Sequence, residues 1–444
     1  MQFFIIFLSV LLAAVLGRLV TTAPHQFLII ASISVIISII AFFSPKLSLV
    51  LLIFSMLLSP EISVGALIGH YRSVVFRYDD ILLVVIFLSW FARTAIFKTK
   101  AFITETPVQT PMLLYTAVCV LSTAMGIFRG EVRYDVAVFY VLKYIEYFLL
   151  YFMTVNIVET KEEAKKYIHY GLAVAFIVSI YAFYYYLNSG ADARATGPFE
   201  APIGRPQDSE PASLGGYYLI VFGIFLGLLG ESSGAWFRWP LFSLAFMFPV
   251  FLFTLSRASY IGLLFSLGAL LAVNRKRKLF LIGLIIAGFI AISLNPVISS
   301  RTKERIEYTY KGTYATEVFE TPFGVIKLEP SASQRVGSWK RSISYWLPKH
   351  PIIGNGVTRT GLVDAQIPLI IGELGIIGLA LWLWMIFVIF RTSWWLYKNT
   401  QDGFVKGIDR TFRPVNRSKY FHNCQNNGAF LVFNRFDYGF AQDD

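Results

Sequence analysis

Long runs of apolar residues constrain this chain more than any other feature of its sequence. Runs of roughly 17–25 residues match the length that an α-helix needs to cross the hydrocarbon core of a membrane. The composition agrees, because 56% of the 444 residues are hydrophobic and only 15% are charged, whereas soluble domains carry about 25% charged residues. The sequence therefore predicts an all-α fold, a polytopic transmembrane helix bundle surrounded by membrane lipids.

Apolar stretches that can enter the membrane occur about twelve times, near residues 2–17, 27–43, 47–58, 80–97, 111–127, 135–155, 167–187, 213–230, 239–255, 257–273, 279–298 and 366–390. The ninth and tenth form an almost continuous run that is too long for one crossing, so we expect a hairpin at Thr254-Leu255-Ser256-Arg257. The first stretch lacks a basic leader and a small-residue cleavage site. It is therefore expected to be a retained helix and not a cleaved signal peptide.

This pattern divides the chain into four parts. Residues 1–298 form a transmembrane bundle, 299–365 a large hydrophilic loop, 366–398 the final transmembrane helix and 399–444 a tail. The tail is rich in Asn and Arg and offers no spanning segment. Two interpretations stay open for it: a disordered cytoplasmic tail, or a reading frame that changes near the start of the tail.

The large loop is expected to carry one amphipathic helix. Ser333 is a candidate N-cap for a helix over residues 334–347 that ends at Pro348. Val336, Trp339, Ile343 and Trp346 would then share one face of the helix. A stripe of this kind suits a helix that lies on the membrane surface or over a cavity.

Basic residues in the short connections predict the orientation of the bundle. The densest basic cluster lies at residues 274–278 and is expected in the cytoplasm. Counting membrane crossings from this cluster places both termini in the cytoplasm. It places outside the loops 59–79, 128–134, 188–212 and 299–365. The membrane is expected to be the inner (cytoplasmic) membrane. The net charge of +12 is explained by this topology, and nucleic acid is not an expected partner.

The three short outer loops contain no lysine but six arginines, which are Arg72, Arg77, Arg129, Arg133, Arg194 and Arg205. Guanidinium groups bind phosphate and carboxylate in a bidentate way and stay charged where water is scarce. The alternative is that single arginines pair with nearby carboxylates, namely Asp79, Asp80, Glu131, Asp135 or Asp192. As a set, the arginines predict an anion-binding outer face.

Three ionisable residues stand out within the apolar stretches. Arg257 lies at the turn between two apolar helices, where an arginine is costly unless it faces a cavity or a partner, so it is a candidate functional residue. The alternative is that its side chain reaches the lipid head groups. Lys143 and Glu146, three residues apart in one predicted span, are expected to form an internal ion pair.

The strings TLSRASYIG (254–262), RATGPF (194–199) and WxxxxxYWxxxHPIIGNG (339–356), followed by GELGIIGLALW (372–382), resemble the O-antigen ligase and O-antigen polymerase superfamily. The resemblance covers roughly residues 130–390 and is strongest over 250–380. Each motif alone has little specificity, but their order, their spacing and the single long outer loop together are specific.

The resemblance implies a membrane glycosyltransferase of the GT-C type that works without a metal or another cofactor. Such enzymes take a glycan from an undecaprenyl-diphosphate carrier and transfer it to a sugar hydroxyl on a glycan or lipid-core acceptor. Outer-face arginines hold the diphosphate in the family, and by motif these match Arg194 and Arg257, with Arg205 and Arg335 as further candidates. In the family pattern HNxYL…ExG a histidine activates the acceptor. Asp364 stands at that position here, so Asp364 or His350 is the expected base.

Two other classes of function stay open from the sequence. A polysaccharide or lipid transporter or flippase would favour internal repeats and charge at the membrane midplane, whereas the sequence shows no clear repeat and concentrates charge at the outer face. A non-catalytic membrane scaffold would fit the replacement of the family histidine by Asp364. Polymerase and ligase differ only in their acceptor and are both retained.

Overall fold

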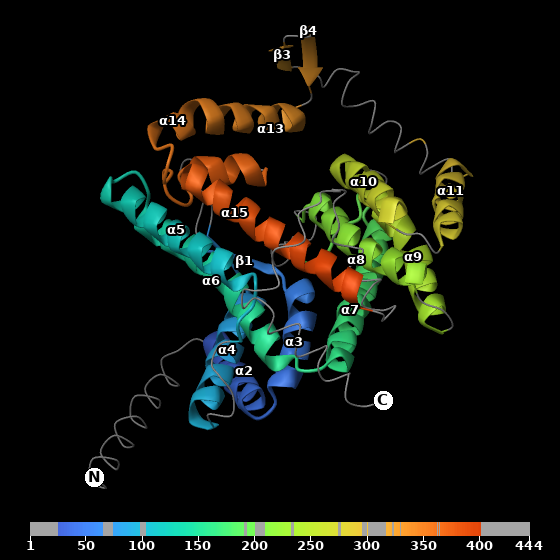
Figure 1. Cartoon of the computed structure of the whole chain (residues 1–444), viewed down its shortest axis with the longest axis horizontal. Helices are drawn as coiled ribbons and strands as arrows, with labels where there is room; N and C mark the ends of the chain where they lie inside the picture. The colour runs from blue at the N-terminus through green and yellow to red at the C-terminus, as the bar shows by residue number, and fades with distance from the viewer. Residues whose placement is uncertain are drawn as a thin grey trace.

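The computed structural model of the chain describes residues 25–64, 74–97, 104–190, 193–199, 209–231, 235–273, 277–294, 300, 317–321, 324–328, 330–361, 363 and 365–400. The first predicted span, the tail beyond residue 400, Arg205 and Asp364 lie outside these residues. Figure 1 shows the whole arrangement.

The described part of the molecule is built mainly from apolar helices, which are α2 (His25–Phe43), α3 (Pro45–Leu58), α4 (Tyr78–Phe97), α5 (Gln109–Phe128), α6 (Tyr134–Ile157), α7 (Lys161–Asn188), α8 (Pro211–Glu231), α9 (Ala235–Phe253), α10 (Arg257–Val273), α11 (Lys278–Leu294) and α15 (Gln366–Asn399). Six of them, α4 to α8 and α15, are long and apolar enough to cross a membrane. The predicted membrane protein is confirmed, whereas the count of twelve spans stays a prediction.

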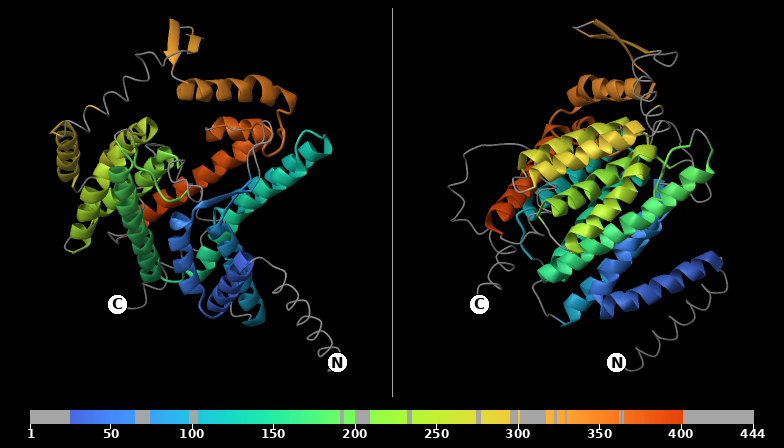
Figure 2. Two further views of the ribbon diagram at one scale, coloured as in Figure 1. Left: turned by 180° about the vertical axis from the view of Figure 1, so that it is seen from behind. Right: turned by 90° about the vertical axis from the view of Figure 1, so that its right-hand side faces the viewer.

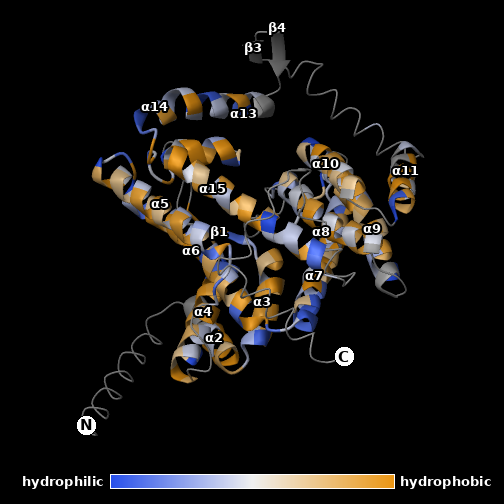
Figure 3. Ribbon diagram, in the orientation of Figure 1, coloured by the Kyte–Doolittle hydropathy of each residue, from blue (hydrophilic) through white to orange (hydrophobic). Residues whose placement is uncertain are grey.

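Many large apolar side chains point away from the interior of the bundle. Leu88, Phe265 and Phe387 are each more than half exposed, and Figure 3 shows apolar residues along most of the helices. A water-soluble protein rarely exposes apolar surface on this scale. The outward-facing side chains therefore fit a lipid environment.

Among the described residues, three clusters of buried side chains hold the helices together. The largest joins α7, α8, α9 and α10, where Phe222 packs against Phe251 with ring centroids 5.3 Å apart, and Figure 2 shows these helices running side by side. A second joins α2, α3, α4 and α6. A third joins α5 and α6 to α15 through Cys119, Val141 and Leu374.

Two antiparallel hairpins depart from the all-α prediction. Strand β1 (Glu61–Val64) pairs with β2 (Val74–Arg77), and β3 (Glu317–Thr321) pairs with β4 (Gly324–Leu328). Both lie in connections predicted to be on the outer side. The prediction of helices is thus confirmed for the apolar segments that the structure describes. The short strands were not predicted because they carry no long alternating pattern.

The amphipathic segment of the large loop differs from its predicted boundaries. It consists of α13 (Pro330–Arg341), the π-helical turn η2 (Ser342–Trp346) and α14 (Leu347–Lys349). The helix begins at Pro330, a residue favoured in the first turn because its missing N–H would have no partner there. The predicted N-cap Ser333 therefore lies inside the helix and is buried. Pro348 does not end the segment, because the preceding η2 turn shifts the hydrogen-bond register.

The predicted ion pair within α6 is also corrected. The Lys143 ammonium Nζ lies 2.7 Å from Oδ2 of Asp80, a residue of α4. Asp80 also accepts a hydrogen bond from the backbone N–H of Arg77, and Arg77 Nε lies 3.1 Å from Asp79 Oδ1. Lys143 thus links α6 to the start of α4, in a cluster to which Glu146 also belongs.

Candidate active site

The predicted helix break at residues 254–256 is confirmed, and it forms the centre of the candidate site. Helix α9 ends at Phe253 and α10 begins at Arg257. The Thr254 hydroxyl donates to the Phe251 carbonyl at 2.7 Å, at the end of α9. Leu255 takes a φ of 49°, which is rare for a residue with a side chain of this size. Such backbone strain is found where a turn is held in place by its surroundings.

Arg194 is one of the residues that hold this turn. Its Nε donates to the Thr254 carbonyl at 2.9 Å and its Nη2 to the Leu255 carbonyl at 3.3 Å. The next residue, Ala195, donates its backbone N–H to the Phe253 carbonyl at 2.9 Å. The RATGPF segment and the TLSR turn, 60 residues apart in sequence, therefore meet in space. The guanidinium of Arg194 lies against the turn that leads directly into Arg257.

Arg257 occupies the first position of α10. Ser256 precedes it as N-cap, and its Oγ accepts a hydrogen bond from the Ser259 N–H at 3.4 Å and contacts the Ser259 Oγ at 2.8 Å. The start of a helix carries a partial positive charge and N–H groups that lack partners within the helix. A guanidinium at this position adds a full positive charge, so the start of α10 is suited to an anion.

Helix α8 completes the wall behind this turn. A Cβ atom on Gly215 would lie 2.3 Å from the Ser259 Oγ, so α8 and α10 approach as closely as they do because residue 215 is glycine. The Ser209 hydroxyl, ahead of α8, bonds the carbonyls of Gly197 and Phe199 at 3.1 and 3.2 Å. The segment 193–199 is thus fixed from both sides, and it presents Arg194 in one position.

The glycine-rich segment 350–361 forms a second junction. Gly354 and Gly356 have φ values of 87° and 95°, and α15 breaks at Gly375, where φ is 68°. A Cβ on Gly354 would lie 2.3 Å from the Glu373 carbonyl oxygen. Only glycines allow segment 350–361 to pack this closely against the break in α15.

Glu373, which is not among the residues predicted for the site, holds this junction from within. It is 2% exposed, and its Oε1 accepts from the Thr358 N–H at 2.9 Å and the Thr360 hydroxyl at 3.2 Å. Its carbonyl accepts from the Ser122 hydroxyl of α5 and from the Gly356 N–H. A glutamate within an otherwise apolar run was the available signal, because buried carboxylates need such partners.

His350 lies at this second junction. Its Nε2 is 3.6 Å from Oε2 of Glu131, which also contacts Arg129 Nε at 3.2 Å. Arg129 in turn donates to the Gly354 carbonyl at 3.1 Å. In Figure 1, α5 and α14 lie near the upper left end of α15, whereas α8 and α10 lie to its right. The structure therefore brings Arg194 to the turn before Arg257, but places His350 on other elements.

The remaining predicted residues are distributed as follows. Arg335 lies on α13, with an exposed side chain. Arg205 and Asp364 are outside the described residues, and Asp364 immediately precedes Ala365, the N-cap residue of α15. The alternative that outer arginines pair with carboxylates is confirmed for Arg77 with Asp79, Arg129 with Glu131 and Arg133 with Asp135. The Arg194 guanidinium donates to the backbone carbonyls of Thr254 and Leu255.

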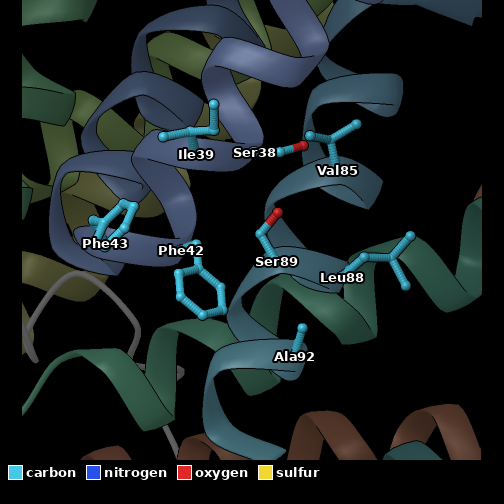
Figure 4. Close-up of a pocket in the computed structure, with 8 residues that line it drawn as sticks. All are labelled: Ser38, Ile39, Phe42, Phe43, Val85, Leu88, Ser89 and Ala92. Carbon is cyan, nitrogen blue, oxygen red and sulfur yellow. The ribbon is translucent and has the colours of Figure 1, made fainter. Parts of the chain in front are cut away.

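The described residues contain no metal-binding cluster and one open apolar groove of note. No group of three or more His, Cys, Asp or Glu side chains is placed to hold a metal ion in that part of the chain. An open groove lies between α2 and α4, as Figure 4 shows, lined by Ser38, Ile39, Phe42, Phe43, Val85, Leu88, Ser89 and Ala92. Its lining carries no charged group, and it lies among helices other than those that hold Arg194 and Arg257.

A known protein family matches the part of the chain that contains these junctions. Residues 242–383 match the family model described as O-antigen ligase. The match includes the α9–α10 turn, α13, the segment 350–361 and the break in α15. No curated protein matches the chain. The predicted O-antigen ligase and polymerase superfamily is therefore confirmed for this region, and the chain carries a membrane enzyme domain of that type.

Proposed function

We propose, from the O-antigen ligase domain at residues 242–383, that the protein transfers a glycan from an undecaprenyl-diphosphate carrier to a sugar hydroxyl on the outer face of the inner membrane. The observation that carries the proposal is the contact of the Arg194 guanidinium with the Thr254 and Leu255 carbonyls. This contact brings two arginines, distant in sequence, to the start of one helix. A diphosphate leaving group requires this kind of concentrated positive charge.

In the proposed reaction the acceptor hydroxyl oxygen attacks the sugar carbon that is bonded to the diphosphate. The new glycosidic C–O bond forms as the old C–O bond breaks, and its electron pair leaves with the diphosphate. Arg257, at the start of α10, and Arg194, beside the turn, would stabilise the negative charge that develops there. The positive charge in this proposal comes from the side chains of the two arginines, so the proposed reaction includes no metal ion.

The hydroxyl proton needs an acceptor, and we propose Asp364 for this role. Asp364 stands two residues before Gln366, where α15 begins, in the position where the family pattern places its base. His350 is the second candidate, but its contacts with Glu131 and its position beside the Gly354 turn favour a role in holding the second junction. Arg205 and Arg335 are proposed as further diphosphate or glycan contacts.

The binding of the carrier can be tested without knowing the sugars. Purified protein in nanodiscs should be stabilised against thermal unfolding by undecaprenyl diphosphate, and much less by undecaprenol, which lacks the phosphates. Arg257→Gln should lose the difference between the two lipids. Arg133→Gln is the matched control, because Arg133 is an outer arginine already paired with Asp135. Equal stabilisation of the parent protein by both lipids would contradict a diphosphate site.

A further inference from the structure

The turn that follows α14 is joined to the membrane-crossing part of α15. The backbone N–H of Ile376 donates to the Pro351 carbonyl at 2.9 Å, and that of Ile377 to the Ile352 carbonyl at 3.3 Å. Ile352 is 62% exposed and Ile376 55% exposed. Both isoleucines of α15 lie just after its break at Gly375, in a helix long and apolar enough to span the membrane. The outward-facing apolar surface of α15 therefore continues onto the turn at Ile352.

Two aromatic rings and a lysine lie just before this turn in the sequence. The Lys349 ammonium lies 4.0 Å from the ring centroid of Tyr345 and 4.9 Å from that of Trp346. A hydrogen bond from Lys349, together with its charge, lowers the pKa of Tyr345. Tyr345 is more than half exposed. The region thus combines exposed aliphatic groups, aromatic rings and a lysine, which are the groups with which membrane proteins contact acyl chains, the interface and the head groups, respectively.

The charge of the neighbouring helix shows which head groups would fit. Residues 330–349 contain Arg335, Lys340, Arg341 and Lys349 but no aspartate or glutamate. Their exposed apolar residues include Val336, Trp339 and Ile343. A helical segment that is basic on one part of its surface and apolar on another binds preferentially to anionic lipid surfaces. The chemistry of the segment is therefore complementary to a lipid with acyl chains and an acidic phosphate.

We propose that the end of η2, α14 and the turn after α14 bind an anionic phospholipid, in the leaflet on the side predicted to face outward. Ile352 lies among the acyl chains beside Ile376, Tyr345 and Trp346 lie at the interface, and Lys349 contacts the phosphate. Because segment 350–361 also holds the break in α15, the lipid would stabilise the outer end of α15. This inference does not depend on the proposed transfer reaction.

A fluorescent label at residue 352 tests the position of the turn in the full-length protein. Cys119→Ala and Cys424→Ser remove the native cysteines, and Ile352→Cys is labelled with an environment-sensitive dye in nanodiscs. We expect lipids with a quencher on the acyl chain to quench this label to a similar extent as a label at Leu383, an exposed position further along α15. Quenching by aqueous iodide instead, or by neither agent, would overturn the proposal, since the turn would then face water or protein.

The charge of the lipid is tested separately, in nanodiscs without any glycan donor. Replacing part of the phosphatidylcholine by phosphatidylglycerol should raise the unfolding temperature of the parent protein, and Lys349→Gln should lose a large part of that rise. Lys165→Gln is the control, because Lys165 pairs with Glu162 at the other end of the bundle. If Lys349→Gln keeps the full dependence on phosphatidylglycerol, Lys349 does not bind the phosphate.

Discussion

The substitution Arg257→Lys isolates what the guanidinium fork contributes to the proposed reaction. Lysine keeps the positive charge at the start of α10, the Ser256 cap and the helix itself. It removes only the planar pair of donors, so one of two charge-assisted hydrogen bonds to the diphosphate should be lost. Such a bond contributes about 1.5–3 kcal/mol. Since each 1.36 kcal/mol is a factor of ten in rate, we expect transfer to slow by roughly 10–100-fold.

The assay is the rate of glycan transfer in membranes that contain equal amounts of parent and variant protein. Arg133→Lys is the control, because it makes the same chemical change at an outer arginine that Asp135 already pairs. We expect this control to transfer at the parental rate. If Arg257→Lys also transfers at the parental rate, Arg257 does not hold the diphosphate through its fork, and the proposed role is refuted.

The other predictions concern the fold. Gly354→Ala should lower the free energy of unfolding by at least about 2 kcal/mol, because φ is positive and the new Cβ would meet the Glu373 carbonyl at 2.3 Å. Gly171→Ala is the control, because a Cβ there would have no atom within 4 Å. In the same thermal unfolding assay this control should not lower the free energy of unfolding. Cysteine at position 311 should react with a membrane-impermeant label in intact cells and cysteine at 276 only after permeabilisation; the reverse pattern would invert the topology. Truncation after Thr400 leaves α15 whole and should leave the unfolding temperature unchanged, whereas a large drop would show that the tail is integral.

Local properties of the chain were enough to predict the helices and the break between α9 and α10. The apolar run before and after Thr254 exceeds the thickness of a membrane, so a turn was required by length alone. The turn also combines Thr254 and Ser256, which bond to backbone groups nearby. The approach of Arg194 to this turn was expected from the family resemblance and from the arginines that the outer loops carry in place of lysines, not from local pattern.

Contacts between distant helices could not be predicted in the same way. Lys143 was assigned to Glu146 because the two residues are three apart on one helix, but its ion pair is with Asp80 of α4. Which carboxylate pairs with Lys143 depends on the rotation of α6 relative to α4, and sequence spacing does not determine that rotation. Likewise, Glu373 becomes a structural centre only because segment 350–361 folds back onto the break in α15.

The most direct test of the account is a transfer reaction with purified components. The protein in nanodiscs is supplied with a glycan on undecaprenyl diphosphate, together with an acceptor glycan, and both lipid and glycan products are quantified. We predict that one undecaprenyl diphosphate is released for each glycan unit added to the acceptor. Both products should fall together in Arg257→Lys and remain in Arg133→Lys. In closed vesicles, movement of the intact lipid-linked glycan across the membrane without release of undecaprenyl diphosphate would contradict the account and indicate a flippase.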